Sequence, residues 1–173
     1  MNLKSILLGL VSVVFCFTAF AAESEYTSVN AEDCITLNSA EFDDEYEIDY
    51  YEAVCRGQGA YVIKVHGGDL RYGVTVLYRG EQVISSLVKI SAFHDLGSEV
   101  VEWRYGSNPV GERVLKALIF RISAYELDQS KNLLHVVKLD KMNTCTVSIL
   151  TDESQDNLKA RSIADNIDAY TCI

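Results

Sequence analysis

The chain has 173 residues, a length that suits one domain of ordinary size. It carries 25 acidic residues against 15 basic ones, which gives a formal net charge of −10 at pH 7. An acidic surface repels phosphate, so the composition argues against a nucleic-acid-binding protein. The same charge attracts cations or basic proteins, although acidity also serves simply to keep a protein soluble.

The first 21 residues have the pattern of a cleavable signal peptide. One positive charge, at Lys4, precedes an apolar stretch that ends in the Ala-x-Ala pattern of signal peptidase at Ala21. This stretch is shorter than the about twenty apolar residues of a membrane span, and acidic residues follow it directly. We therefore expect a periplasmic or secreted protein whose mature part, residues 22–173, is one domain without membrane insertion.

An acidic and aromatic segment occupies residues 41–52, where seven of twelve side chains are carboxylates. Such dense carboxylates repel one another and favour a solvated loop or a counter-cation. A calcium loop is a weaker interpretation because the Asp-x-Asp-x-Asp-Gly order is absent. A third interpretation is a docking surface for a basic partner, with tyrosines as anchors. Its candidate residues are Asp43, Asp44, Glu45, Tyr46, Glu47, Tyr50 and Tyr51.

The rest of the chain has the pattern of an antiparallel sheet followed by one helix. Residues 31–37 form a possible short strand, and seven clearer strand candidates are separated by turn-forming residues. These candidates are residues 60–65, 70–78, 82–90, 99–105, 114–122, 133–139 and 144–150. Residues 154–169 have a helical pattern with one apolar face, formed by Ala160, Ile163, Ala164 and Ile167. We expect a monomeric α+β fold with a sheet of about six or seven strands and a C-terminal helix packed on it.

Two pairs of opposite charges, each spaced two residues apart, make a candidate polar cluster. Asp69 and Arg71 form one pair and Glu102 and Arg104 the other, so in strands each pair shares a face. If the two strands are neighbours, the four charges form a ladder of ion pairs with Trp103 on the opposite face. The functional alternative is a polar pocket in which an arginine receives a carboxylate or phosphate.

Four cysteines remain after signal cleavage, and an even number in an exported chain indicates disulfides. Of the three possible connectivities we favour the local one, Cys34–Cys55 and Cys145–Cys172. The C-terminal helix runs back along the sheet by about 24 Å and so returns Cys172 toward Cys145. No C-x-x-C spacing supports a metal site, and bridged cysteines leave no thiol nucleophile.

The remaining chemistry-bearing residues form no catalytic or metal-binding motif. The three histidines, His66, His94 and His135, lack metal-site spacing and are interpreted as unrelated turn and strand residues. A nucleophile elbow is absent, and Val62 occupies the third glycine position of a dinucleotide fingerprint. We therefore expect neither a metal nor a cofactor.

Several short motifs together resemble an uncharacterised family of exported proteobacterial proteins. They are Cys55-x-Gly57-x-Gly59-x-Tyr61, Gly68-Asp69-x-Arg71, Phe93, Glu102-Trp103-Arg104, and Ala160-Arg161-x-Ile163-Ala164-Asp165 followed by Cys172. The resemblance covers most of the mature chain, which departs from it in a longer acidic insert before Cys55. It implies bacterial export and carries no reaction or site residue.

Three functional hypotheses follow. The first is a non-enzymatic exported protein that binds a basic protein or cell-envelope component through the acidic segment or the surface around Asp69. The second is a small periplasmic hydrolase that uses Asp69, Arg71, Glu102 and one histidine. The third is a structural envelope protein without a discrete site.

Overall fold

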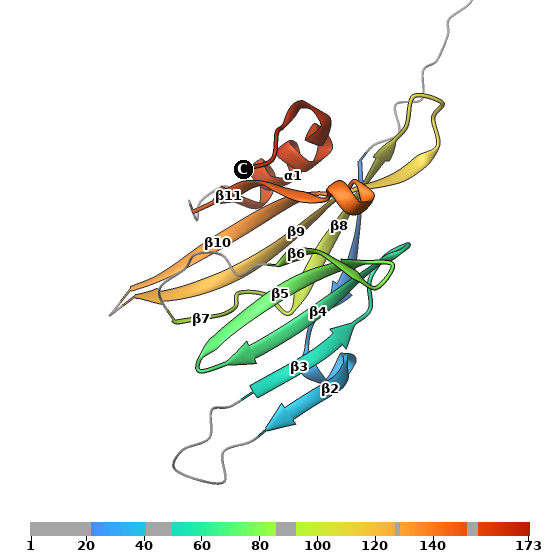
Figure 1. Cartoon of the computed structure of the whole chain (residues 1–173). Coiled ribbons are helices and arrows are strands. Elements are labelled where there is room, and N and C mark those ends of the chain that lie inside the picture. Colours follow the sequence, from blue (N-terminus) through green and yellow to red (C-terminus); the bar gives the residue numbers. More distant parts are fainter. Residues whose placement is uncertain (1–21, 41–49, 86–92, 127–128, 152–155) are drawn as a thin grey trace, which may run out of the picture.

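The structure is a computed structural model that describes residues 22–40, 50–85, 93–126, 129–151 and 156–173 (Figure 1). The expected signal peptide, residues 1–21, lies outside the described residues. The described residues contain eleven strands joined into one hydrogen-bonded sheet. The strands are β1 (Glu23–Ser28), β2 (Ile35–Ala40), β3 (Tyr50–Cys55), β4 (Tyr61–Gly68), β5 (Arg71–Tyr78), β6 (Glu81–Ser85), β7 (Phe93–Leu96), β8 (Val100–Ser107), β9 (Arg113–Glu126), β10 (Gln129–Lys138) and β11 (Cys145–Leu150).

The sheet folds into two layers that face each other. Strands β2 to β6 form one layer, and β1 with β8 to β11 forms the other, with the helix α1 (Asp156–Asp165) on its outer side (Figure 1). The short strand β7 joins the layers, because it pairs antiparallel with β9 and meets β5 at one parallel bridge, Arg71 to His94. All other strand pairs are antiparallel.

The main core lies between the two layers. Ile63 and Val65 of β4 belong to the same buried cluster as Trp103 of β8 and Leu118 of β9. Trp103 is fully buried, and its indole N–H donates to the Thr27 hydroxyl at 2.9 Å. Alternation along β8 places Glu102 and Arg104 on the opposite face from Trp103, as the sequence predicts.

A second core lies between the outer layer and α1. The helix contributes the apolar face expected from its sequence, and the strands contribute residues that alternate with those of the main core. The strand residues are Ala117, Ile119, Leu134, Val136, Val147 and Leu150. The helix is shorter than the expected 154–169, since it ends at Asp165 and a 3-10 turn (Ile167–Ala169) follows. Residues 152–155, which include the start of the expected helix, lie outside the described residues. No helix among the described residues is long and apolar enough to cross a bilayer.

The sheet has more strands than the six or seven expected, so that part of the prediction is wrong. Strand β1 has a polar sequence with one buried residue, Thr27, and β3 begins inside the acidic segment and has two buried residues, Ala53 and Cys55. Strand β7 has only four residues. The possible strand at 31–37 is a 3-10 turn (Ala31–Asp33) followed by β2.

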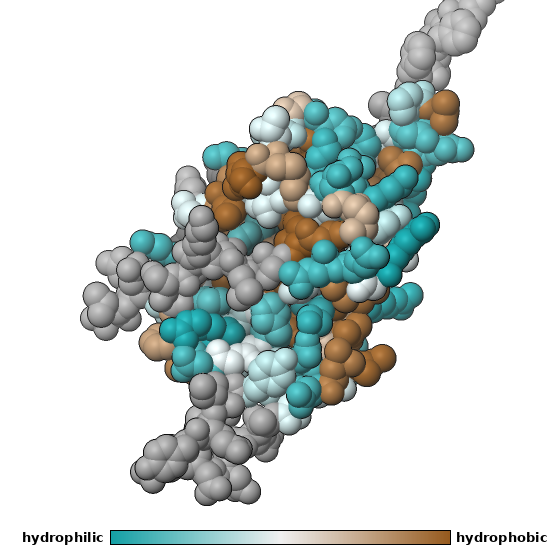
Figure 2. All heavy atoms as spheres, viewed as in Figure 1, coloured by the Kyte–Doolittle hydropathy of each residue, from teal (hydrophilic) through white to brown (hydrophobic). Residues whose placement is uncertain are grey.

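Strand β2 is the edge of its layer. Its residues Ile35 and Leu37 are among the exposed large hydrophobic side chains, and Figure 2 shows hydrophobic surface near this edge. A β-bulge interrupts its pairing with β3 between Thr36 and Asn38, and bulges of this kind protect edge strands from unwanted pairing.

Two disulfides tie down the ends of strands in the pairing that the sequence favours. Cys34–Cys55 links the start of β2 to the end of β3, with 4.3 Å between the Cα atoms. Cys145–Cys172 links the start of β11 to the C-terminus, with 5.6 Å between the Cα atoms. The amide of Ile173 donates to the Thr146 carbonyl at 3.0 Å, so the C-terminal residues lie along β11. Two disulfides fit an oxidising, extracellular type of environment.

Replacing Cys145 and Cys172 with serine is expected to lower the free energy of unfolding by about 3 kcal/mol, because the bridge restricts the unfolded chain. Urea denaturation followed by Trp103 fluorescence under non-reducing conditions measures the change. Serine at Cys34 and Cys55 is the matched comparison, because it opens a loop of similar length and should cost a similar amount. A serine variant at Cys145 and Cys172 as stable as the parent would contradict this account of the C-terminus.

Candidate functional site

A network of charged side chains joins β8, whose members are buried, to α1. The Arg161 side chain donates to Glu102 through two bonds, Nε to Oε1 at 2.7 Å and Nη2 to Oε2 at 3.0 Å. The Ser24 hydroxyl donates to Glu102 Oε1 at 2.5 Å from the neighbouring strand β1. The bidentate geometry is the strongest form of an arginine–carboxylate pair. Only 11% of the Glu102 side chain is exposed, and these hydrogen bonds largely offset the energetic cost of burying its charge.

A second ion pair lies beside the first with the opposite polarity. Arg104 donates to Asp165 Oδ1 from Nε at 3.0 Å and from Nη2 at 2.5 Å, and only 8% of the Arg104 side chain is exposed. Two residues along a strand advance by about 6.6 Å, and four residues along a helix by about 6 Å. The Glu-x-Arg of β8 therefore matches the spacing of Arg161 and Asp165 on α1.

The surroundings of Glu102 favour its ionised form. Burial by itself raises the pKa of this carboxyl, but the hydrogen bonds from Arg161 and Ser24 and the nearby arginine charges outweigh burial. The pKa of Glu102 is therefore below its ordinary value. A carboxylate held in this way is a structural anchor and a poor proton donor.

The other predicted charge pair lies elsewhere, so the condition for a four-charge ladder, two neighbouring strands, is not met. Asp69 and Arg71 form an ion pair at the β4–β5 turn, where their side chains are 63% and 42% exposed. Strands β9 and β7 lie between β8 and β5 in the sheet order, so the two pairs are not neighbours. Arg71 instead stacks over the Phe93 ring, with its Cζ atom 5.1 Å from the ring centre. Trp103 points into the core and takes no part in either pair.

The groups required by the hydrolase hypothesis do not all converge, because Arg71 pairs with His94 at the β5–β7 bridge but Glu102 lies on the distant strand β8. Asp69 and Arg71 are exposed at a turn, whereas Glu102 is covered by α1. Among the histidines, His135 is buried against Phe120 with ring centres 4.7 Å apart, and burial lowers the pKa of His135 to about 4. Burial also lowers the pKa of His66. Within the part of the chain that the structure describes, no three metal-ligating side chains come together.

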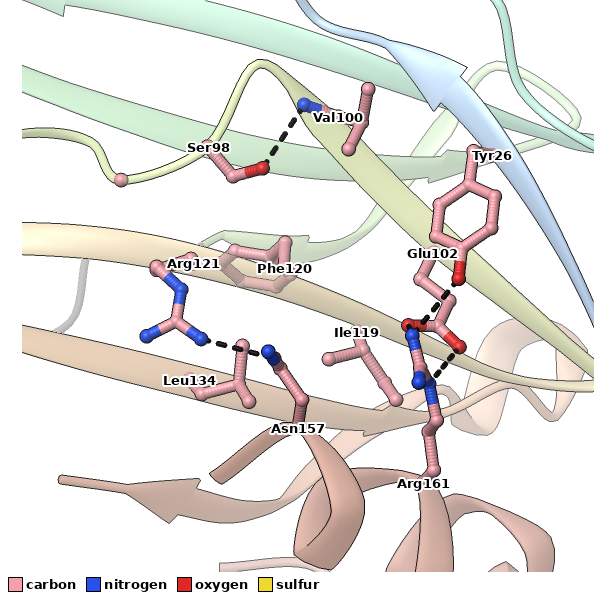
Figure 3. Close-up of a pocket in the computed structure, with 11 residues that line it drawn as sticks. Tyr26, Ser98, Val100, Glu102, Ile119, Phe120, Arg121, Leu134, Asn157 and Arg161 are labelled. Carbon is pink, nitrogen blue, oxygen red and sulfur yellow. Dashed lines mark hydrogen bonds and ion pairs between the residues drawn. The ribbon is translucent and has the colours of Figure 1, made fainter. Parts of the chain in front are cut away.

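A cleft of about 240 Å³ opens between α1 and the outer face of β8 and β9 (Figure 3). The Glu102–Arg161 pair and the Tyr26 hydroxyl lie at one end, where Arg161 Nη2 donates to that hydroxyl at 2.9 Å. Arg121 lies at the other end and donates from Nη2 to the Asn157 side-chain oxygen at 3.0 Å. The lining residues are Tyr26, Gly97, Ser98, Val100, Glu102, Ile119, Phe120, Arg121, Leu134, Asn157 and Arg161.

A second hollow, of about 330 Å³, lies where the β4–β5 turn meets β7. Its apolar residues Leu70, Tyr72, Phe93 and Tyr125 are here called the end patch. Leu70 is 64% exposed, and Phe93 and Tyr125 are each 47% exposed. His94 and Asp95 complete the lining. Exposed apolar side chains gathered around a hollow are typical of an interaction surface.

Leu70, a member of this patch, is held in an unfavourable backbone conformation. Asp69 and Leu70 have φ angles of 51° and 58°, the left-handed region that a two-residue hairpin turn requires. Glycine or asparagine usually occupies such positions, and a leucine there is strained. The Leu70 carbonyl accepts a hydrogen bond from the His94 amide at 3.1 Å, which fixes the turn against β7. Strain of this kind is characteristic of functional surfaces.

The last residues of the acidic segment, 50–52, lie in β3 near the same turn. Its candidate residues Asp43, Asp44, Glu45, Tyr46 and Glu47 lie outside the described residues, while Tyr50 and Tyr51 belong to β3. The expected exposed loop is therefore wrong for residues 50–52. Tyr50 pairs with Gly68 beside the β4–β5 turn and is 41% exposed. Tyr51 packs against the main core, which makes it a poor anchor for a partner.

Comparisons with protein-family models, with curated proteins and with solved structures each found no match to this chain. Its function is therefore argued from the chemistry of these surfaces.

Sequence reasoning missed the residues that complete the charge network and the end patch. Arg161 and Asp165 are four apart on one helix face, in the polarity opposite to Glu102 and Arg104, and this complementarity was a usable signal. The end patch left no such signal, because its members come from four separate strands and turns.

Replacing Glu102 with glutamine is expected to lower the free energy of unfolding by about 3 kcal/mol at pH 7, because Arg161 and Arg104 lose their buried partner. Folding lowers the pKa of Glu102, so its ionised form stabilises the fold above the unfolded pKa, and this contribution is lost as the pH falls through the folded pKa. The parent should thus lose stability below about pH 4.3. The Glu102→Gln variant should lose less stability over the same fall in pH, as measured by urea denaturation.

The matched control is Glu32→Gln at an exposed acidic residue, which should leave both stability and its pH dependence unchanged. If the Glu102 variant had the same free energy of unfolding as the parent both at pH 7 and below about pH 4.3, the charge network would not be what holds α1 in place.

Proposed function

We propose that this chain is an exported, non-enzymatic protein that binds a basic protein, or another basic component of the cell envelope, through the end patch. The observation that carries the proposal is the exposed Leu70, held at a positive φ angle beside the exposed rings of Phe93 and Tyr125. A leucine at this position destabilises the fold, whereas its exposed side chain is well placed to contact a partner. Three further features support the proposal: the apolar residues around Leu70, the negative net charge of the chain and the signs of export.

The end patch has the composition of a small binding anchor. Its one phenylalanine ring, its two tyrosine rings and its leucine supply apolar area at low entropic cost, and aromatic anchors dominate the energy of many interfaces. A rim of exposed charge surrounds them, with Asp69 and Arg71 on the turn and Asp95 on β7. An apolar centre with a charged rim is the usual anatomy of a transient interface.

Charge selects the partner. The chain has a net charge of −10, and its most acidic segment, residues 41–52, joins β2 to β3 and reaches β3 at Tyr50, beside the β4–β5 turn. A field of this sign attracts a basic protein and raises the association rate. The same field repels anionic lipid, so a membrane surface is the less suitable partner.

Export fits this partner class. The two disulfides suit an oxidising compartment, and the pattern of residues 1–21 is that of a signal peptide. We propose a periplasmic or secreted location, in agreement with the resemblance to exported proteobacterial proteins. The separation of the Asp69 and Glu102 pairs removes the geometric support for a hydrolase built from them.

Replacing Leu70 with glycine separates binding from folding. Glycine suits the positive φ angle, so the variant should be as stable as the parent or more stable. Loss of the side chain should nevertheless weaken binding of a lysine-rich probe peptide with a central Leu-Trp pair by about 2 kcal/mol, roughly thirtyfold in Kd. Calorimetric titration measures Kd, and thermal denaturation measures stability.

The matched control is Leu158→Ala, because Leu158 is 70% exposed on α1 and lies outside the end patch. It should bind the peptide like the parent. Neutralising Asp43, Asp44, Glu45 and Glu47 together should weaken binding and flatten its salt dependence. Unchanged affinity in the Leu70 variant, or equal binding of a glutamate-rich peptide, would refute the proposal.

A further inference from the structure

The cleft beside α1 differs in charge from the molecule around it. Two arginines, Arg121 and Arg161, and one carboxylate, Glu102, line it, which leaves a net positive charge in a chain whose net charge is −10. An arginine in a hollow of net positive charge indicates a site for an anion. The cleft shares no lining residue with the end patch, so this inference stands apart from the proposed function.

The two arginines are not equivalent. Glu102 accepts both hydrogen bonds from Arg161 and neutralises it within the fold. Arg121 makes no ion pair among the residues that the structure describes, and the bond it donates there goes to the uncharged side-chain oxygen of Asn157. A guanidinium has five N–H donors in a fixed fork, which matches a carboxylate or a phosphate. Arg121 is therefore the group available to an incoming anion.

The position of Arg121 is built into the fold. It lies on β9, the strand that is buried on both faces, between Phe120 of the main core and Ile122. The amide of Gly97 donates to the Arg121 carbonyl at 3.0 Å. A Cβ atom at Gly97 would lie 2.6 Å from Arg121 Cγ, so only glycine leaves room for the arginine stem at this point. The stem of Arg121 is thus confined where it leaves the strand, which limits the positions that the guanidinium can take.

The middle of the cleft is apolar. Ile119 and Leu134 lie between Arg121 and the Glu102–Arg161 pair (Figure 3). At the far end the Tyr26 hydroxyl accepts a bond from Arg161, which leaves its own proton free to donate. The volume of about 240 Å³ is below the range of drug-sized ligands, so the cleft suits a short chain or a single ring.

We propose that this cleft binds a small amphiphilic anion. Its carboxylate or phosphate head group binds Arg121, and its short apolar chain lies over Ile119 and Leu134. Carboxylate and phosphate share the chemistry that Arg121 recognises, so the probes decide between them.

The experiment titrates the folded mature protein with hexanoate and with hexyl phosphate, and follows amide chemical shifts by NMR. Hexanol and hexylamine are the matched probes without a negative charge. We expect at least one of the two anions to bind in the millimolar range, with shifts at Gly97, Arg121 and Asn157, and neither uncharged nor cationic probe to do so. The anion that binds more tightly identifies the head group.

The variant Arg121→Gln should bind that anion at least about tenfold more weakly, since the charged fork is lost. Arg79→Gln, at an exposed arginine that stacks on Tyr78, is the matched control and should bind like the parent. Arg121→Lys retains the charge without the fork and should bind with intermediate affinity. It replaces the glutamine variant as the test if the glutamine variant does not fold. Binding of neither anion, equal binding of hexanol, or undiminished binding by a folded Arg121 variant would overturn the proposal.

Discussion

Strands β8 and β9 are buried on both faces, and the remainder of the molecule is arranged to satisfy that constraint. The inner face presents Trp103 and Leu118 to the opposite layer, whereas the outer face presents Glu102 and Arg104. Charges buried on a strand destabilise a protein unless they are paired with good geometry. Helix α1 supplies both partners, so it covers the apolar second core and neutralises the charged strand at once.

The two candidate surfaces depend on different parts of this arrangement. The cleft exists because α1 is held against β8 by ion pairs at Arg161, while Arg121 stands free of charged partners among the described residues. The end patch exists because β7 joins the two layers and holds the β4–β5 turn through the Leu70 carbonyl. The effect of a substitution in one surface can therefore be measured without disturbing the other surface.

The sequence predicts the strands that carry strong apolar patterns, the disulfide pairing, and the opposite faces of Trp103 and Glu102. It does not predict β1, whose composition is polar, or β3, which begins inside the acidic segment and has only two buried residues. The partner of Glu102 lies 59 residues away, a distance over which no local rule sets the register. The expected meeting of Asp69 with Glu102 fails for a topological reason, since β7 and β9 lie between their strands. The end patch depends on a turn conformation that the leucine itself disfavours.

Native-state hydrogen exchange in the variant Arg104→Gln tests most directly whether the paired charges hold α1 in place. The account predicts that the amides of Ala160 and Ile163 lose protection by orders of magnitude, while those of Leu118 and Val136 in the sheet keep most of theirs. Protection of the α1 amides that falls only in step with the sheet amides would contradict it, because packing alone would then hold the helix.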